Sequence, residues 1–151
     1  MNVYHVGSQK YAAQLTGEGA KLHGGRWNNI GTPCIYTSES IALSILEFAA
    51  NVSVDLMPAS LAITVYFIPE QSWKEFSSNE LPENWQRTPA HAESKLFGSE
   101  FLNTAKYLVL KVPSAVIPLE YNYIINPLHP DFKKVKLKEV HPFTFDTRIK
   151  Q

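Results

Sequence analysis

The chain has 151 residues, of which 44% are hydrophobic and 19% are charged, proportions typical of one globular domain rather than of a disordered chain. Fourteen basic residues balance fourteen acidic ones, so the net charge at pH 7 is zero, and this argues against direct nucleic-acid binding. We find no apolar run of membrane-spanning length and no secretory signal, and the single cysteine fits a reducing compartment, so we expect a cytoplasmic protein that does not contact a membrane.

The first quarter of the chain predicts two strands separated by a glycine-rich loop. Residues 2–6 are typical of a short strand, and a brief helical turn is expected around residues 9–14. Residues 16–32 hold five of the seven glycines, and glycine adopts backbone angles that other residues resist, so we expect a loop with a tight hairpin. Residues 33–38 then predict a strand.

A helix and a buried strand are predicted next. Ser38 or Ser40 can cap a helix that ends near Asn51, because the apolar residues of this segment recur at helical spacing. Residues 61–68 are β-branched and aromatic and predict a central strand. Residues 70–88 combine two tryptophans, a proline and mixed charge, and we expect an irregular segment with one short helix.

The remaining chain predicts one more helix and three strands. The helix is expected to start at Thr88-Pro89, with proline in its first turn, and to extend to about Asn103. The strands are expected at residues 106–112, 121–125 and 135–145. In the last of them lysines alternate with apolar residues, which predicts one buried and one solvated face; contact with an acidic partner is the alternative. Strands interleaved with two or three helices predict an α+β fold with a mixed, curved β-sheet core and flanking short helices.

Several catalytic motifs are absent from the sequence. It contains no phosphate-binding Walker loop, no Gly-x-Gly-x-x-Gly after a strand and no His-Glu-x-x-His. The five histidines are scattered without metal-ligand spacing, so we predict no metal site. Cys34 lies between Pro33 and Ile35, and we interpret it as a small buried apolar residue rather than a nucleophile.

The segment Gly24–Asn28, Tyr36 and Glu47 each have an ordinary structural interpretation. Arg26 could be a surface arginine, Trp27 a core anchor, Tyr36 a residue packed on the sheet and Glu47 part of a solvated helix face. Together they suggest chemistry on a dinucleotide. An arginine beside two glycines can grip a pyrophosphate, and an aromatic ring can stack on a cationic nicotinamide. A carboxylate can bind ribose and stabilise positive charge developing at the transition state.

Ser114 lies in a segment fixed by prolines on both sides, Pro113 and Pro118. A strand end followed by turn residues is the simpler interpretation and the one we favour from the residues alone. The functional alternative is a hydroxyl presented to a ligand by a rigid loop.

Three blocks of the sequence resemble the RES domain, a toxin family named for an arginine, a glutamate and a serine. They are residues 15–20 leading into 24–28, residues 36–40 leading through Ala42 and Leu43 to Glu47, and residues 112–116 followed by Asn122, Asn126-Pro127 and 129–132. Their order and extent match a single RES-like domain over residues 1–151.

The resemblance implies an ADP-ribosyltransferase-like fold, NAD⁺ as substrate and an Xre-type antitoxin as partner. It places the catalytic residues at Arg26, Tyr36, Glu47 and Ser114: Arg26 on the phosphates, Tyr36 against nicotinamide, Glu47 on the ribose, and Ser114 near nicotinamide or the acceptor. Further NAD⁺ contacts are expected from Gly25, Trp27, Asn28 and Asn126 of the matching segments and from His5 of the first strand. His5 is a departure, because members commonly carry arginine there; histidine can still donate a hydrogen bond to ribose.

We therefore expect a bacterial toxin that cleaves the nicotinamide–ribose bond of NAD⁺ as a glycohydrolase or phosphorylase. One alternative is a mono-ADP-ribosyltransferase that modifies a cellular protein, and another is a non-catalytic antitoxin-binding module. The sequence leaves open whether the acceptor is water, phosphate or protein. It also leaves open the oligomeric state, a homodimer included.

Overall fold

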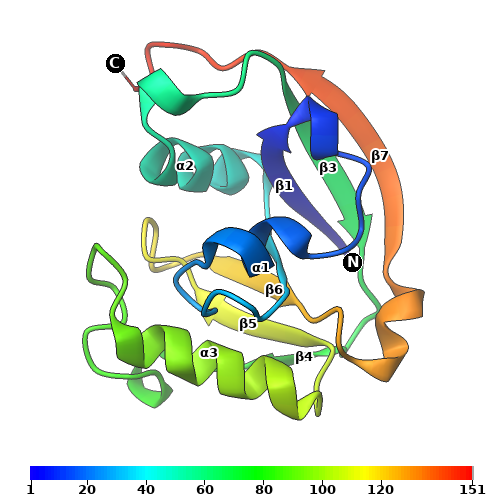
Figure 1. Cartoon of the computed structure of the whole chain (residues 1–151), viewed down its shortest axis with the longest axis vertical. Helices are drawn as coiled ribbons and strands as arrows, with labels where there is room; N and C mark the ends of the chain where they lie inside the picture. The colour runs from blue at the N-terminus through cyan, green and yellow to red at the C-terminus, as the bar shows by residue number, and fades with distance from the viewer. Residues whose placement is uncertain (151) are drawn as a thin grey trace.

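The computed structural model describes residues 1–150, which form one seven-stranded sheet in the order β4-β5-β6-β2-β1-β3-β7 (Figure 1). The strands are β1 (Asn2–Ser8), β2 (Ile35–Ser38), β3 (Leu61–Phe67), β4 (Trp73–Glu75), β5 (Val109–Pro113), β6 (Tyr121–Ile125) and β7 (Lys136–Phe143). β4 and β5 run parallel, whereas the other neighbours are antiparallel. β1 and β2 pair only at Tyr4 and Ser38, so the two halves of the sheet diverge at this point.

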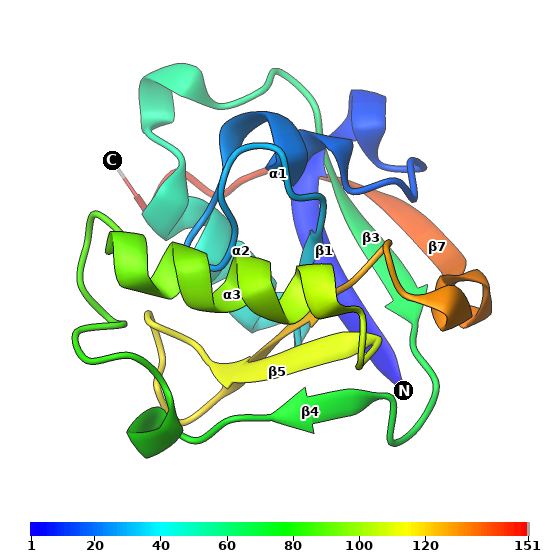
Figure 2. The ribbon, with the colours of Figure 1, turned by 60° about the horizontal axis from the view of Figure 1, so that its bottom comes forward.

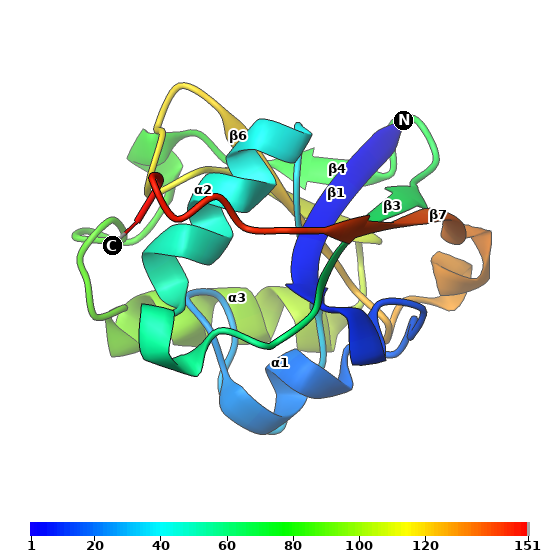
Figure 3. The same cartoon turned by 90° about the horizontal axis from the view of Figure 1, so that it is seen from above.

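Three short helices flank the sheet: α1 (Glu18–His23), α2 (Ile41–Asn51) and α3 (Ala92–Thr104), with 3-10 turns η1 (Gln9–Tyr11), η2 (Val54–Leu56), η3 (Ser78–Glu80) and η4 (Pro130–Lys134). α3 lies along β5 (Figure 2), and α2 lies beside β1 when the molecule is seen from above (Figure 3). No helix among residues 1–150 has the length and apolarity needed to cross a membrane. The architecture confirms the predicted α+β fold with a mixed sheet.

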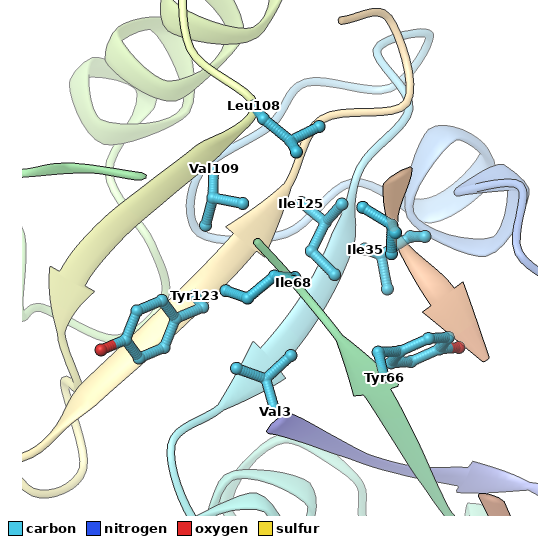
Figure 4. Packing of buried hydrophobic residues seen from close by; sticks show 9 residues of the cluster. Val3, Ile35, Tyr66, Ile68, Leu108, Val109, Tyr123 and Ile125 are labelled. Atoms are coloured by element: carbon cyan, nitrogen blue, oxygen red, sulfur yellow. The ribbon is translucent and has the colours of Figure 1, made fainter. Parts of the chain in front are cut away.

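The largest core cluster joins both halves of the sheet. Val3 of β1, Tyr66 of β3 and Ile125 of β6 lie in it, with Ile68 and Val109 fully buried among them (Figure 4). Burial of apolar area contributes roughly 25 cal/mol per Å² to the stability of the fold. This cluster therefore holds the two halves of the sheet together although β1 and β2 diverge. A second cluster packs α3 on β5 and β6, and a third packs α2 on β1 and β3.

The N-terminal predictions are confirmed apart from the long loop. Residues 16–32 contain helix α1, which we did not predict. Its two flanking glycines, Gly17 and Gly24, have φ angles of 75° and 71°, so glycine serves the helix ends instead of preventing the helix. Glu18 in the first turn and His23 in the last complement the helix dipole. The expected hairpin is present, because Gly25 and Asn28 form an isolated antiparallel bridge.

The prediction for residues 70–88 and for the following helix is partly wrong. The short η3 turn is present, but the segment also contains the edge strand β4, whose three residues are too few to show a periodic pattern. α3 begins at Ala92 and not at Thr88, because the Arg26 side chain binds the Arg87 carbonyl and the Thr88 hydroxyl and holds them in the preceding loop.

The predicted positions of β3, β5, β6 and β7 are right to within three residues. The predicted place of β3 in the sheet and the predicted burial of β7 are wrong. β3 lies between β1 and β7, next to the edge rather than at the centre of the sheet. β7 was expected to bury one face, yet all but its last residue are exposed, Leu137 and Val140 included. β7 is an edge strand, and lysines on such a strand discourage pairing with other chains.

Candidate functional site

A cleft of about 650 Å³ opens where β1 and β2 diverge, a volume within the range of small-molecule sites. Its walls come from β1, α1, the loop of residues 24–27, β2 and α2. Of the nine predicted site residues, the cleft is lined by His5, Gly25, Arg26, Trp27, Tyr36 and Glu47; Asn28, Ser114 and Asn126 are not lining residues.

Glu47 enters the cleft from the middle of α2. The helix begins where the Ser40 hydroxyl accepts a hydrogen bond from the amide of Leu43, as predicted. Glu47 is half-buried, and its Oε1 accepts two short hydrogen bonds, one from Ser114 Oγ and one from Asn122 Nδ2, each 2.6 Å long. Oε2 has only a long contact, 3.4 Å, with Asn51 Nδ2. One oxygen is therefore fixed, while the other remains available to a ligand.

Ser114 supports Glu47 instead of lining the cleft. It is fully buried at the end of β5, and its Oγ accepts hydrogen bonds from the amides of Val116 and Ile117, both 3.0 Å long. With both acceptor positions used, its own proton is donated to Glu47. The predicted hydroxyl is thus presented by a rigid loop, but to the carboxylate and not to open space.

Arg26 lines the cleft and also binds the loop that precedes α3. Its Nη1 donates to the carbonyls of Trp85 and Arg87, both at 2.7 Å, and Nη2 donates to Thr88 Oγ1 at 3.4 Å. Burial lowers the pKa of Arg26, and this is opposed by the nearby Glu47 carboxylate and by Tyr36. Arg26, Tyr36 and Glu47 therefore line one cleft, and Glu47 is close enough to act on the guanidinium.

Tyr36 packs its ring against the backbone of Gly25. A Cβ atom at Gly25 would lie 2.6 Å from the Tyr36 hydroxyl and 2.8 Å from Cζ, so glycine is required for this approach. The hydroxyl donates to Asn28 Oδ1 and accepts from the Trp27 amide. Burial raises the pKa of Tyr36 well above its usual value, so the side chain is a neutral phenol with its hydrogen bonds already satisfied, and its ring is what it offers to a ligand.

His5 connects the two halves of the sheet at the cleft. Its Nδ1 lies 2.8 Å from the Tyr36 carbonyl oxygen, and because that oxygen can only accept, Nδ1 carries the proton. Burial lowers the pKa of His5, with the hydrogen bond to the Tyr36 carbonyl acting in the opposite direction. The ring is thus favoured in its neutral form, with Nε2 as an acceptor.

Three residues predicted to contact NAD⁺ are buried. Trp27 is 2% exposed and stacks on Trp85, with ring centroids 6.1 Å apart. Asn28 Nδ2 donates to the carbonyls of Ala20 and Thr32, and Asn126 Nδ2 donates to that of Leu102. These contacts make Trp27 a core anchor, which was its ordinary structural interpretation, and they make the two asparagines internal struts. Cys34 is also buried, and burial raises the pKa of its thiol to about 12, which confirms its interpretation as an unreactive core residue.

Two polar residues at the site were not among the predicted site residues. Asn122 donates to Glu47, and Lys95 of α3 donates from Nζ to the Gly25 carbonyl at 2.9 Å. Asn122 did carry a signal, because asparagine is depleted in strands and this one lies within the strand Tyr-Asn-Tyr-Ile-Ile. Lys95 carried none, since a lysine on a helix is ordinarily solvated.

The sequence was compared with known families and proteins. The RES domain family matches residues 2–146. A protein named Toxin Res from Photorhabdus laumondii is 36% identical over 99% of this chain and 97% of its own length. A protein from Sphingobium sp. named Prs ADP-ribosylating toxin is 34% identical over 91% of this chain and 88% of its own.

The fold was compared with solved structures. A chain in the crystal structure of the M. tuberculosis MbcT-MbcA toxin-antitoxin complex superposes with a TM-score of 0.77, covering 95% of this chain and 84% of that one. At 16% identity this similarity concerns the fold alone.

Proposed function

The chain belongs to the RES domain family, and from that premise we propose that it is a toxin that consumes NAD⁺ by breaking the bond between nicotinamide and ribose in the cleft around Glu47. The names of its relatives in Photorhabdus laumondii and Sphingobium sp. support the toxin assignment, and the second of these names includes ADP-ribosylation.

The observation that carries this proposal is the placement of the Glu47 carboxylate and of its hydrogen-bond donors. Two donors converge on Oε1, and Glu47 lines a cleft together with Arg26 and Tyr36. A fixed negative charge is what an oxocarbenium-like transition state requires, because the charge of the sugar rises as the bond to the base breaks.

The proposed step is heterolytic. The C1′–N bond of the nicotinamide riboside moiety breaks, its electron pair leaves with neutral nicotinamide, and positive charge develops on C1′ and the ring oxygen. Glu47 Oε2 stabilises that charge and binds the ribose hydroxyls. Arg26 holds phosphate oxygens through the donors that its contacts with residues 85–88 do not use, and the Tyr36 ring packs on nicotinamide. Addition of water to C1′ with loss of a proton gives ADP-ribose; addition of phosphate gives ADP-ribose 1″-phosphate.

Incubation of the purified chain with NAD⁺, with and without phosphate, tests this proposal. We expect release of nicotinamide, measured by chromatography, with ADP-ribose as the second product in water and its phosphate ester when phosphate is the acceptor. Unchanged NAD⁺ under both conditions, with the chain shown to be folded by circular dichroism, would contradict the proposal.

A second candidate, transfer of ADP-ribose to a protein, is favoured by the name of the Sphingobium relative. The same cleft would break the same bond, but a protein side chain would replace water. Cell extract treated with the chain and isotope-labelled NAD⁺ separates the two: a labelled peptide in mass spectrometry supports transfer, and labelled free ADP-ribose alone opposes it.

We also propose an antitoxin protein of the Xre type as partner. The support is the superposition on a chain from a toxin-antitoxin complex. Co-expression with an antitoxin of the Xre type, followed by size-exclusion chromatography, tests it: co-elution is expected, and separate elution would contradict it.

A further inference from the structure

Glu47 is held by a second hydrogen-bonded residue that is itself oriented by a third. Asn122 of β6 donates from Nδ2 to Glu47 Oε1 at 2.6 Å, and Asn122 Oδ1 lies 2.7 Å from Ser38 Oγ. Ser38 and Asn122 are directly opposite each other in the β2–β6 pairing. Ser38 is also the residue at which β1 pairs with β2, so this contact lies where the sheet divides to form the cleft.

The direction of each hydrogen bond in this chain is fixed by what its members can do. Glu47 Oε1 already accepts from Ser114, whose own acceptor positions are used by two backbone amides. Oε1 is therefore an acceptor, and the Asn122 atom facing it must be the NH₂ group. The Asn122 carbonyl then faces Ser38, so the Ser38 hydroxyl must donate. Without that donor, Asn122 could rotate its amide and present a carbonyl oxygen to the carboxylate.

The two donors to Glu47 come from separate parts of the chain. Ser114 is held by the turn after β5, whereas Asn122 is held by β2 through Ser38. Ser38 is 3% exposed, so its hydroxyl has little alternative in solvent. Two independently fixed donors on one oxygen leave the carboxylate little freedom to rotate in the cleft that Glu47 lines.

We infer that Ser38 and Asn122 are positioning residues for Glu47, with Ser38 acting through Asn122. This inference rests on the proposed function for its kinetic consequence. Its structural consequence, an Asn122 amide held against a carboxylate, does not depend on any activity.

Kinetics of NAD⁺ consumption test the inference through a double-mutant cycle. Misplacement of a reacting group by about 1 Å lowers rates by about 100-fold, so we expect Asn122→Ala to lower kcat by about 10- to 100-fold with little change in KM. Ser38→Ala should lower kcat by a smaller factor, and the double variant should be no worse than Asn122→Ala alone. Asn103→Ala, an exposed asparagine on α3 outside the cleft, is the matched control and should leave kcat unchanged.

Asn122→Asp keeps the size of the side chain but replaces the donor with a second carboxylate. Like charges at this distance oppose ionisation of both groups, so we expect at least as large a loss of kcat as in Asn122→Ala. Melting temperatures of all variants show whether a loss of activity reflects unfolding.

Two kinetic outcomes would overturn the inference in an active wild-type chain. If the losses in Ser38→Ala and Asn122→Ala multiply in the double variant, Ser38 does not act through Asn122. If Asn122→Ala raises KM and leaves kcat unchanged, Asn122 binds substrate directly, which its place in the wall of the cleft would permit.

Nuclear magnetic resonance of the ¹⁵N-labelled chain provides the test that needs no activity. One side-chain amide proton of Asn122 should resonate downfield in the wild type, lose that shift in Glu47→Ala and have it reduced in Ser38→Ala. An Asn122 signal that is the same in all three proteins would overturn the inference, even in a chain that consumes NAD⁺. Conversely, a wild-type chain that shows these shifts but leaves NAD⁺ intact would keep the inference and remove the proposed function.

Discussion

The loop of residues 24–28 and the surroundings of Glu47 are two halves of one site, and they are built in different ways. In the loop, neighbours in the sequence have unrelated tasks: Arg26 faces the cleft, Trp27 anchors the core and Asn28 binds backbone carbonyls on its inner side. Around Glu47, residues distant in the sequence share one task, because Ser114 and Asn122 both donate to the same oxygen.

Because of this difference, the two halves of the site differ in how far they can be predicted from the sequence. A short run of unusual residues located the loop, but it could not say which of them face the ligand. The Glu47 half depends on contacts across 67 and 75 positions of the chain, so it needed the sheet to be in place before its members could be assigned. We expect the loop to act mainly as scaffold and the Glu47 half to carry most of the chemistry.

Trp27→Ala should produce the largest effect. Truncation of a buried tryptophan costs about 3–5 kcal/mol, and Trp27 is stacked on Trp85 and meets the edge of Phe97 at 5.9 Å. We expect a loss of this size in the free energy of unfolding, measured by urea denaturation. A Trp27→Ala variant that keeps wild-type stability but loses NAD⁺ affinity would instead show that Trp27 binds the ligand. The proposed contrast between the loop and the surroundings of Glu47 would then be wrong.

Asn28→Ala should have a smaller effect of the same kind. The change removes the donor to the carbonyls of Ala20 and Thr32 and the acceptor of the Tyr36 hydroxyl proton, and an unsatisfied buried group costs about 1–3 kcal/mol. Urea denaturation of this variant beside Asn103→Ala, an exposed control, isolates the effect of burial. Equal stabilities for the two variants would show that Asn28 is not a strut.

Much of the fold could be predicted from the sequence, but less of the site. The order of most elements and a serine cap at the start of α2 followed from local patterns, since each depends on residues a few positions apart, whereas Arg26, Tyr36 and Glu47 were chosen from their combination and from the resemblance to the RES domain. Helix α1 was missed because its glycines belong to its ends, and β4 was missed because three residues show no period. That Ser114 acts on Glu47, and that Asn122 joins it, depends on the pairing of β5, β6 and β2, which no local pattern contains.

The smallest expected effect is a pH dependence of stability from His5. Its pKa in the folded chain is lowered from 6.5 by burial, so on acidification below about 6.5 the unfolded chain takes up a proton that the folded chain resists. Stability is then fully present above that pH and falls as the pH drops toward the folded value. In His5→Gln this part of the slope should vanish, as measured by urea denaturation between about pH 7.5 and about pH 5.5 (one unit on either side of the reference value). An unchanged slope would show that His5 is not the responsible group.

Nicotinamide release by the wild-type chain and by Glu47→Gln tests the central claim most directly. Glutamine keeps the size of the side chain and an oxygen that can accept from Ser114 and Asn122, but it removes the negative charge. Loss of a preorganised electrostatic group lowers kcat by about 10²–10³-fold, and we predict a loss of at least this size while the melting temperature stays close to that of the wild type. A folded Glu47→Gln variant that releases nicotinamide at the wild-type rate would contradict the account.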